Sequence, residues 1–270
     1  MTYKALARIL LRLLSMLMPH ETLPRISANT ALFLDFDGTL VEIASEPGAV
    51  LIPPTLTSTL AALYSQLDGA LALVSGRRLL DLDGFLAPLQ LPAAVEHGAQ
   101  RRNAQGQLIS APAADLRHVL AAAEGLIRQY PDLQLEHKNL ALSLHYRHAP
   151  HLEALCLEVM RAAVAQSSGL QLMLGKCVID LKLTGFSKGT AIAAFMTEAP
   201  FAGRIPLFAG DDVTDEDGFR AVRDLGGHAV KVGPGDTTAP YRCAGVPEMA
   251  TWLQSALVPS LASRAESLPS

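Results

Sequence analysis

Short apolar runs that end in glycine or polar residues recur along the chain. They occupy residues 31–36, 71–74, 93–95, 206–209 and 229–232. Apolar runs of this length, bounded by turn signals, indicate buried strands. Helix-like stretches such as 56–67 and 190–197 lie between them. Strands that alternate with helices predict an α/β fold, with a doubly wound, Rossmann-like, mostly parallel sheet covered on both faces. Ligands of such sheets bind beyond the carboxyl ends of the strands, where the polar residues gather.

The pattern changes between residues 107 and 184. A helix at 113–129 is followed by two strands within 133–146, and a helix at 151–166 by two strands within 170–183. This repeated unit predicts an antiparallel sheet backed by two helices, which is an inserted α+β cap domain able to hinge over the site. The core then comprises residues 21–106 and 185–258. We expect the Ser/Ala/Pro-rich residues 259–270 to form a flexible tail.

The first twenty residues have a character of their own. Residues 5–18 are strongly apolar, and Lys4, Arg8 and Arg12 follow one helical stripe, so residues 1–20 are expected to form an amphipathic helix. The stretch is too short to span a bilayer and lacks a small-residue cleavage site. We interpret it as a packing or oligomer-forming helix, with attachment to a membrane surface as the alternative. No transmembrane segment is expected, and the oligomeric state stays open.

Composition narrows the class of protein. Half of the 270 residues are hydrophobic and 5% are aromatic, which is typical of a soluble, helix-rich globular protein. A net charge of −4 without a long basic run argues against nucleic acid and favours a small-molecule partner. Three widely separated cysteines support neither a disulfide framework nor a closed zinc site. They favour a reducing, cytoplasmic location.

Two carboxylates lie at the end of the first predicted strand. Asp35 and Asp37 flank Phe36, and Gly38 comes next. The glycine permits a sharp turn, so that one carboxylate can face a phosphorus atom while the other leans over the leaving oxygen. Phosphoryl transfer requires both functions, an in-line nucleophile and a proton donor. Taken in isolation, however, Asp-x-Asp-Gly is more often a structural turn.

Three further clusters follow in order. Ser75 opens a Ser-Gly-Arg loop and can donate hydrogen bonds to a phosphoryl oxygen, although alone it reads as a helix cap. Lys188 precedes a helix and can neutralise the transferred group, although alone it reads as a surface lysine. Asp211 lies in an acidic cluster after a strand. Together with Asp35 and the backbone carbonyl of Asp37 it can form an oxygen site for Mg²⁺, with Asp212 and Asp215 behind it. Four such matches in this order favour the catalytic interpretation.

This ordered set resembles the haloacid dehalogenase-like superfamily of aspartate-nucleophile phosphotransferases. Asp35 and Asp37 match its first motif, Ser75 its second, Lys188 its third, and Asp211 with Asp215 its fourth. Three features are similar to the trehalose-6-phosphate phosphatase family: the inserted segment, the stretch 96–99 and the sequence Gly-Asp-Asp-Val-Thr-Asp-Glu at 210–216. The resemblance extends from about residue 30 to residue 252. The resemblance implies hydrolysis of trehalose 6-phosphate, the last step of trehalose biosynthesis, through a Mg²⁺-dependent aspartyl phosphate.

The same resemblance implies a set of substrate-binding residues. They are Gly76, Arg77, Glu96 and His97 of the core, and Glu136, Lys138, His145, Arg147, Lys176 and Asp180 of the cap. Asp180 departs from the family, in which a glutamate is usual, so the shorter acid is expected to reach a sugar hydroxyl through water. The charged cap residues also fit a solvated salt-bridged sheet face, and the two histidines fit structural hydrogen-bonding roles.

Two other functions fit the same motifs. A phosphatase for sucrose phosphate, mannosylphosphoglycerate or a hexose phosphate shares the core motifs. A catalytically idle regulatory subunit that binds phosphosugars belongs to another class, and an intact nucleophile position argues against it.

Overall fold

The computed structural model describes residues 22–257, except residues 45, 47, 138, 139, 141 and 176. The helix predicted for residues 1–20, the tail predicted for 259–270, and Lys138 and Lys176 therefore lie outside the described residues. In the part of the chain that is described, no helix combines the length and the apolar character needed to cross a membrane.

Within the described residues, eight strands form one sheet in the order β12-β11-β10-β1-β2-β3-β4-β5. Their bounds are Thr30–Leu34 (β1), Leu71–Val74 (β2), Ala93–Val95 (β3), Gln100–Arg102 (β4), Leu108–Ser110 (β5), Ile205–Gly210 (β10), His228–Val232 (β11) and Tyr241–Cys243 (β12). Every pairing from β12 to β3 is parallel, while β3–β4 and β4–β5 are antiparallel. The predicted mostly parallel, doubly wound sheet is confirmed.

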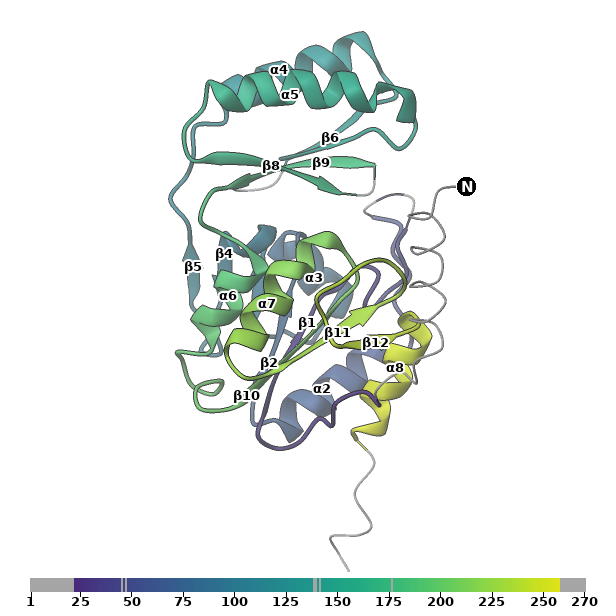
Figure 1. The fold of residues 1–270 in the computed structure, drawn as a ribbon, viewed down its shortest axis with the longest axis vertical. Coiled ribbons are helices and arrows are strands. Elements are labelled where there is room, and N and C mark those ends of the chain that lie inside the picture. The colour runs from purple at the N-terminus through teal and green to yellow at the C-terminus, as the bar shows by residue number, and fades with distance from the viewer. Residues whose placement is uncertain are drawn as a thin grey trace, which may run out of the picture.

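Helices cover both faces of this sheet (Figure 1). They are α2 (Leu56–Gln66), α3 (Leu79–Leu86), α6 (Lys188–Phe195), α7 (Glu216–Asp224) and α8 (Val246–Ser255). Helices α6 and α7 pack against each other, as do α2 and α8. The central strand β1 is buried along its whole length, and Phe33 stacks on Phe201 with ring centroids 5.4 Å apart. Burial of each such side chain stabilises the folded core by roughly 1.5–3 kcal/mol. The carboxyl ends of the strands are therefore held in fixed positions.

A second, four-stranded antiparallel sheet forms a separate lobe, with its helices on the outer side (Figure 1). Its strands are β6 (Gln134–His137), β7 (Leu142–His145), β9 (Val178–Leu183) and β8 (Leu170–Gly175), in that order, and its helices are α4 (Arg117–Gln129) and α5 (Glu153–Ala165). Leu144, Ile179 and Leu181 face the helices in a hydrophobic cluster of their own. Since strand side chains alternate, Ser143 and Asp180 face the opposite side, toward the larger sheet.

The start of one helix and the end of the first core segment differ most from the sequence-based expectation. Helix α4 begins at Arg117 rather than at residue 113, and the Asp115 side chain accepts a hydrogen bond from the Arg117 backbone N–H at 3.1 Å. The larger sheet extends to Ser110, beyond the expected boundary at residue 106. The polar residues 103–107 form the turn of the β4–β5 hairpin, in which Oδ1 of Asn103 accepts the backbone N–H of Gln107 at 2.9 Å.

Candidate active site

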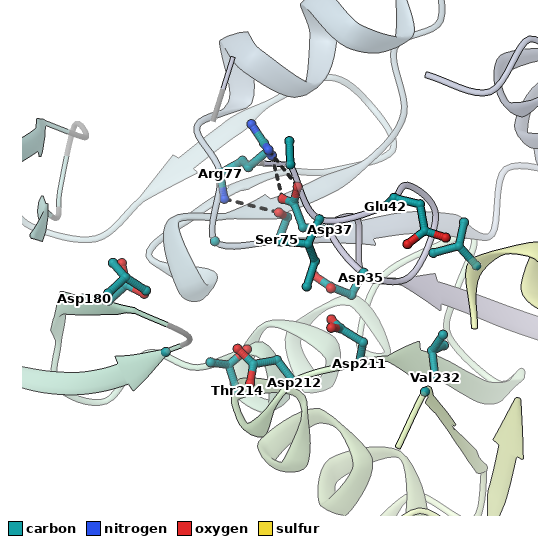
Figure 2. Close-up of a pocket in the computed structure, with 18 of the residues that line it drawn as sticks. Asp35, Asp37, Glu42, Ser75, Arg77, Asp180, Asp211, Asp212, Thr214 and Val232 are labelled. Atoms are coloured by element: carbon teal, nitrogen blue, oxygen red, sulfur yellow. Dashed lines mark hydrogen bonds and ion pairs between the residues drawn. The ribbon is translucent and has the colours of Figure 1, made fainter. Parts of the chain in front are cut away.

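A cavity of about 900 Å³ lies between the carboxyl ends of the core strands and the polar face of the cap sheet. Most of the site residues expected from the sequence line it. They are Asp35, Asp37, Ser75, Gly76, Arg77, His97 and Lys188 with Asp211 and Asp212 from the core, and Glu136, His145, Arg147 and Asp180 from the cap. Figure 2 shows Asp35 and Asp211 close together, with Asp37 and Arg77 on one side and Asp180 farther away across the pocket.

Asp35 and Lys188 form a buried ion pair at the floor of the cavity. Asp35 follows β1 directly, and Lys188 is the first residue of α6, where Ser187 and Thr190 form a capping box. The Lys188 Nζ lies 2.7 Å from Oδ1 of Asp35 and 2.6 Å from Oδ1 of Asp215. The side chains of all three residues are almost fully buried. Burial of this kind is tolerated because each charge has a partner at hydrogen-bond distance.

The protonation of this pair is set by competing effects. Burial raises the pKa of Asp35 well above its ordinary value, and the Asp215 and Asp211 carboxylates raise it further, against the opposing Lys188 ammonium. Burial alone would lower the pKa of Lys188, but the Asp215 and Asp35 carboxylates outweigh it and raise the pKa above its ordinary value. Lys188 therefore stays an ammonium, a fixed positive charge beside Asp35.

Asp37 points away from Asp35 and is held by an arginine. The Arg77 Nε donates to Oδ2 of Asp37 at 2.6 Å, and Nη2 donates to Oδ1 at 2.7 Å. The guanidinium also lies over the rings of Phe85 and Phe36, at 5.0 and 5.8 Å from their centroids. Such stacking and bidentate bonding orient an arginine strongly. Gly38 makes the divergence possible, because the turn after Asp37 requires its φ of +76°.

Three carboxylates form the candidate metal centre. Oxygens of Asp35, Asp211 and Asp215 lie within 4.8 Å of one another, which fits the hard oxygen ligands of a divalent cation. Burial, with help from the Asp215 carboxylate, raises the pKa of Asp211 to about 7. Both oxygens of Asp215 are already used, by Lys188 and by the backbone N–H of Asp212 at 2.9 Å. These two hydrogen bonds fix the orientation of the Asp215 carboxylate beside Asp35 and Asp211.

The cap contributes a polar wall. Oε2 of Glu136 lies 3.1 Å from Nε2 of His145, and the Ser143 hydroxyl donates to Oδ1 of Asp180. Oδ2 of Asp180 is 3.8 Å from Nε2 of His97, so this carboxylate lies at the junction of cap and core.

Glu96 is placed differently from the other expected substrate-binding residues. It is fully buried, it adopts a φ of +49°, and its Oε2 accepts the Leu140 backbone N–H at 2.7 Å. It joins the cap to the core in this structure, behind the cavity wall.

Sequence reasoning missed several residues of this region. Glu42 and Ser143 line the cavity, and no motif distinguished them. The turn at Gly38 was expected from the sequence, but its second effect was not: the glycine leaves room for Asp211, because a Cβ there would clash with Oδ2 of Asp211. Lys231 is a buried lysine in β11. Its signal was readable, since a lysine inside an apolar strand is unusual.

A doubly wound core, a second lobe inserted into it and a buried aspartate–lysine pair at the strand ends characterise this chain as a phosphatase. A sequence model of the trehalose-phosphatase family matches residues 33–246, and the chain belongs to this family.

Relatives and solved structures agree with this assignment. The chain is similar to a trehalose-6-phosphate phosphatase of Escherichia coli (strain K12), at 44% identity over 238 residues, covering 87% of this chain and 90% of the relative. A solved structure of a trehalose-6-phosphate phosphatase related protein superimposes with a TM-score of 0.68 at 29% identity, over 86% of this chain and 99% of the other. The C-terminal domain of trehalose-6-phosphate phosphatase from C. albicans gives 0.76 at 22% identity, over 86% and 92%, and at that identity it supports the fold alone.

Proposed function

We propose that this phosphatase hydrolyses trehalose 6-phosphate to trehalose and phosphate, the last step of trehalose biosynthesis. One relationship supports this most directly: the cavity that contains the Asp35–Lys188 pair continues without interruption to Glu136, His145 and Asp180 of the cap. A phosphorylated disaccharide needs both parts, a phosphoryl-transfer centre and hydroxyl-binding groups at a distance from it. The E. coli relative is named for this activity.

The first half-reaction uses Asp35 as nucleophile. An oxygen of Asp35 attacks the phosphorus, a bond from Asp35 to phosphorus forms, and the bond from phosphorus to the sugar oxygen breaks. Asp37 protonates the departing sugar oxygen. Lys188 and the Ser75 hydroxyl neutralise or bind the phosphoryl oxygens. A Mg²⁺ ion held by Asp35, Asp211 and the Asp37 backbone carbonyl would supply further neutralisation of those oxygens.

The second half-reaction restores the enzyme. Asp37, now deprotonated, takes a proton from a water molecule, whose oxygen attacks the phosphorus and releases Asp35 as a carboxylate. Arg77 must release Asp37 before the acid step, because in the present arrangement both carboxylate oxygens accept its N–H groups. A phosphate oxyanion offers Arg77 an alternative bidentate partner, so substrate binding itself can cause this exchange.

The cap supplies selectivity. Glu136, His145, Arg147 and Asp180, with Lys138 and Lys176 as further members of the set, bind the sugar hydroxyls and exclude bulk water when the cap closes. Three free cysteines, Cys156, Cys177 and Cys243, accord with a cytoplasmic location.

A substrate panel tests the proposal. Phosphate release is measured from trehalose 6-phosphate, sucrose 6-phosphate, mannosylphosphoglycerate and glucose 6-phosphate, each with Mg²⁺ and with excess chelator. We expect the highest kcat/KM on trehalose 6-phosphate and no turnover in chelator. A higher kcat/KM on another member of the panel would reassign the substrate, and no turnover on any member would favour a regulatory subunit.

A further inference from the structure

Lys231 is a buried lysine that the proposed chemistry does not use. It lies in β11, opposite Gly210 of β10 in the parallel register, and only 4% of its surface is exposed. Lysine is almost never buried to this extent unless its ammonium has partners, because desolvation of the charge is costly. The groups that accept hydrogen bonds from the Lys231 ammonium therefore indicate the role of this residue.

The partners of Lys231 are backbone carbonyl groups. Nζ donates to the carbonyl oxygen of Asp211 and, at 2.8 Å, to the carbonyl oxygen of Val232. These carbonyls belong to the chain where β10 has just ended and where β11 ends. One side chain thus connects two adjoining strand ends, and one of its two acceptors belongs to a residue of the candidate metal centre.

Asp211 is consequently constrained from several directions. Its carboxylate occupies the space left by the missing Cβ of Gly38, and the missing Cβ of Gly210 leaves room for the side chain of Asp215. Lys231 restrains the backbone of Asp211 through the hydrogen bond to its carbonyl oxygen. Its positive charge also interacts with the carboxylates of Asp211, Asp215 and Asp212 and, unfavourably, with the guanidinium of Arg242. Both effects favour a compact cluster of carboxylates, which otherwise repel one another.

We propose that Lys231 is a positioning residue that fixes the Asp211 turn and thereby sets the affinity of the acidic cluster for its divalent cation. This inference rests on the proposed function only for the presence of a cation at Asp35 and Asp211, not for the identity of the sugar. Loss of the hydrogen bond that holds the turn is expected to weaken cation binding about tenfold, because the misplaced ligand outweighs the electrostatic gain from removing a positive charge near the cation.

The neighbouring strand provides a matched control. Arg242 in β12 pairs with Lys231 in the sheet and also donates to backbone carbonyls, those of Gly233 and Gly235, the latter at 2.7 Å. The substitution Arg242→Met therefore removes a cation and two hydrogen bonds to backbone carbonyls, neither of which belongs to the Asp211 turn.

The experiment compares Lys231→Met with Arg242→Met in the full-length protein. The increase in Tm caused by Mg²⁺ is titrated in the absence of substrate, because a ligand that binds the folded state stabilises it. This measurement is independent of which phosphate ester the enzyme hydrolyses. We expect the Mg²⁺ concentration for half of the increase to rise about tenfold in Lys231→Met and to stay within twofold of wild type in Arg242→Met.

Turnover of an aryl phosphate gives a second measurement. At saturating Mg²⁺, kcat of Lys231→Met should recover to within about threefold of wild type, since the chemical groups are intact. If Lys231→Met does not fold, Lys231→Gln, which keeps a neutral N–H donor, replaces it. An unchanged Mg²⁺ midpoint, or equal changes in the two variants, would overturn the proposal and leave Lys231 a residue of general stability. A protein whose Tm does not respond to Mg²⁺ at all would instead contradict the metal centre.

Discussion

Arg77 binds both carboxylate oxygens of Asp37, at 2.6 and 2.7 Å, although the two residues lie 40 positions apart in the chain. The proposed proton donor is thus held as a hydrogen-bond acceptor. Proton donation requires Arg77 to exchange partners, which couples phosphate binding to the acid step.

The role of Asp37 can be separated from that of Asp35 with an aryl phosphate. Such a substrate has a good leaving group that departs without protonation. In Asp37→Asn, phosphorylation of Asp35 should therefore proceed while hydrolysis of the aspartyl phosphate slows by roughly 10²–10⁴-fold. Rapid-mixing kinetics should show a burst of about one equivalent of aryl alcohol. A linear time course at the wild-type rate would rule out Asp37 as the base of the second step.

Asp35→Asn should abolish turnover almost completely. The amide cannot form the covalent intermediate, and activity should decrease by several orders of magnitude on every substrate. Acid-quenched protein should show a phosphorylated peptide containing Asp35 in the wild type and none in the variant, by mass spectrometry. Near-wild-type phosphate release from the variant would exclude the mechanism.

Removal of a metal ligand should act differently from removal of a surface carboxylate. Asp211→Asn takes one negative charge from the acidic cluster, and we expect the Mg²⁺ requirement to rise at least tenfold with a loss of kcat. Asp224→Asn changes an exposed aspartate at the end of α7 and should leave both quantities unaltered. Phosphate release is followed against the Mg²⁺ concentration. Full activity of Asp211→Asn in excess chelator would contradict the metal assignment.

Cap residues should affect the sugar substrate alone. Glu136→Ala, Lys138→Ala and Arg147→Ala are expected to lower kcat/KM on trehalose 6-phosphate by about tenfold to a hundredfold, because each removes a charged hydrogen bond of roughly 1.5–3 kcal/mol. Hydrolysis of a small aryl phosphate should hardly change. Glu158→Ala, on the exposed side of α5, is the control. Equal losses on both substrates would show that these residues support the fold and not recognition.

Tyr146 makes the stability of the cap sensitive to high pH. Burial and a hydrogen bond to Glu153 at 3.1 Å raise the pKa of Tyr146 to about 12, against 10 for the free group. The folded state holds this proton more tightly, so the stabilisation is present below pH 10 and is lost as the pH rises toward 12. The difference in unfolding free energy between wild type and Tyr146→Phe should shrink over that range by about 2 kcal/mol. Urea titrations at several pH values measure it, and a constant difference would contradict the shift.

Much of the fold could be predicted because local patterns are sufficient for it. The run 71–74 and strand β2 coincide, Ser75 and Asp211 each follow a predicted strand, and Asp35 lies at the end of one. Parallel strands bring their carboxyl ends to one edge, so the convergence of these residues with Lys188 follows from the class of sheet. Strands β4 and β12 escaped prediction, because the three residues of β4 are all polar and Arg242 interrupts β12, so that neither forms an apolar run.

The amino-acid sequence by itself therefore determined the class of fold, the family resemblance and the residues that meet at the strand ends. Only the tertiary structure decided how these residues are paired. Arg77 faces Asp37, Glu96 faces the backbone of Leu140, and Lys231 faces the backbone of Asp211. The physical reason is that a hydrogen bond depends on distances of about 3 Å and on direction, whereas a sequence pattern specifies only which elements are neighbours. Side-chain partners across a sheet or between two lobes are determined by packing, and packing exists only in three dimensions.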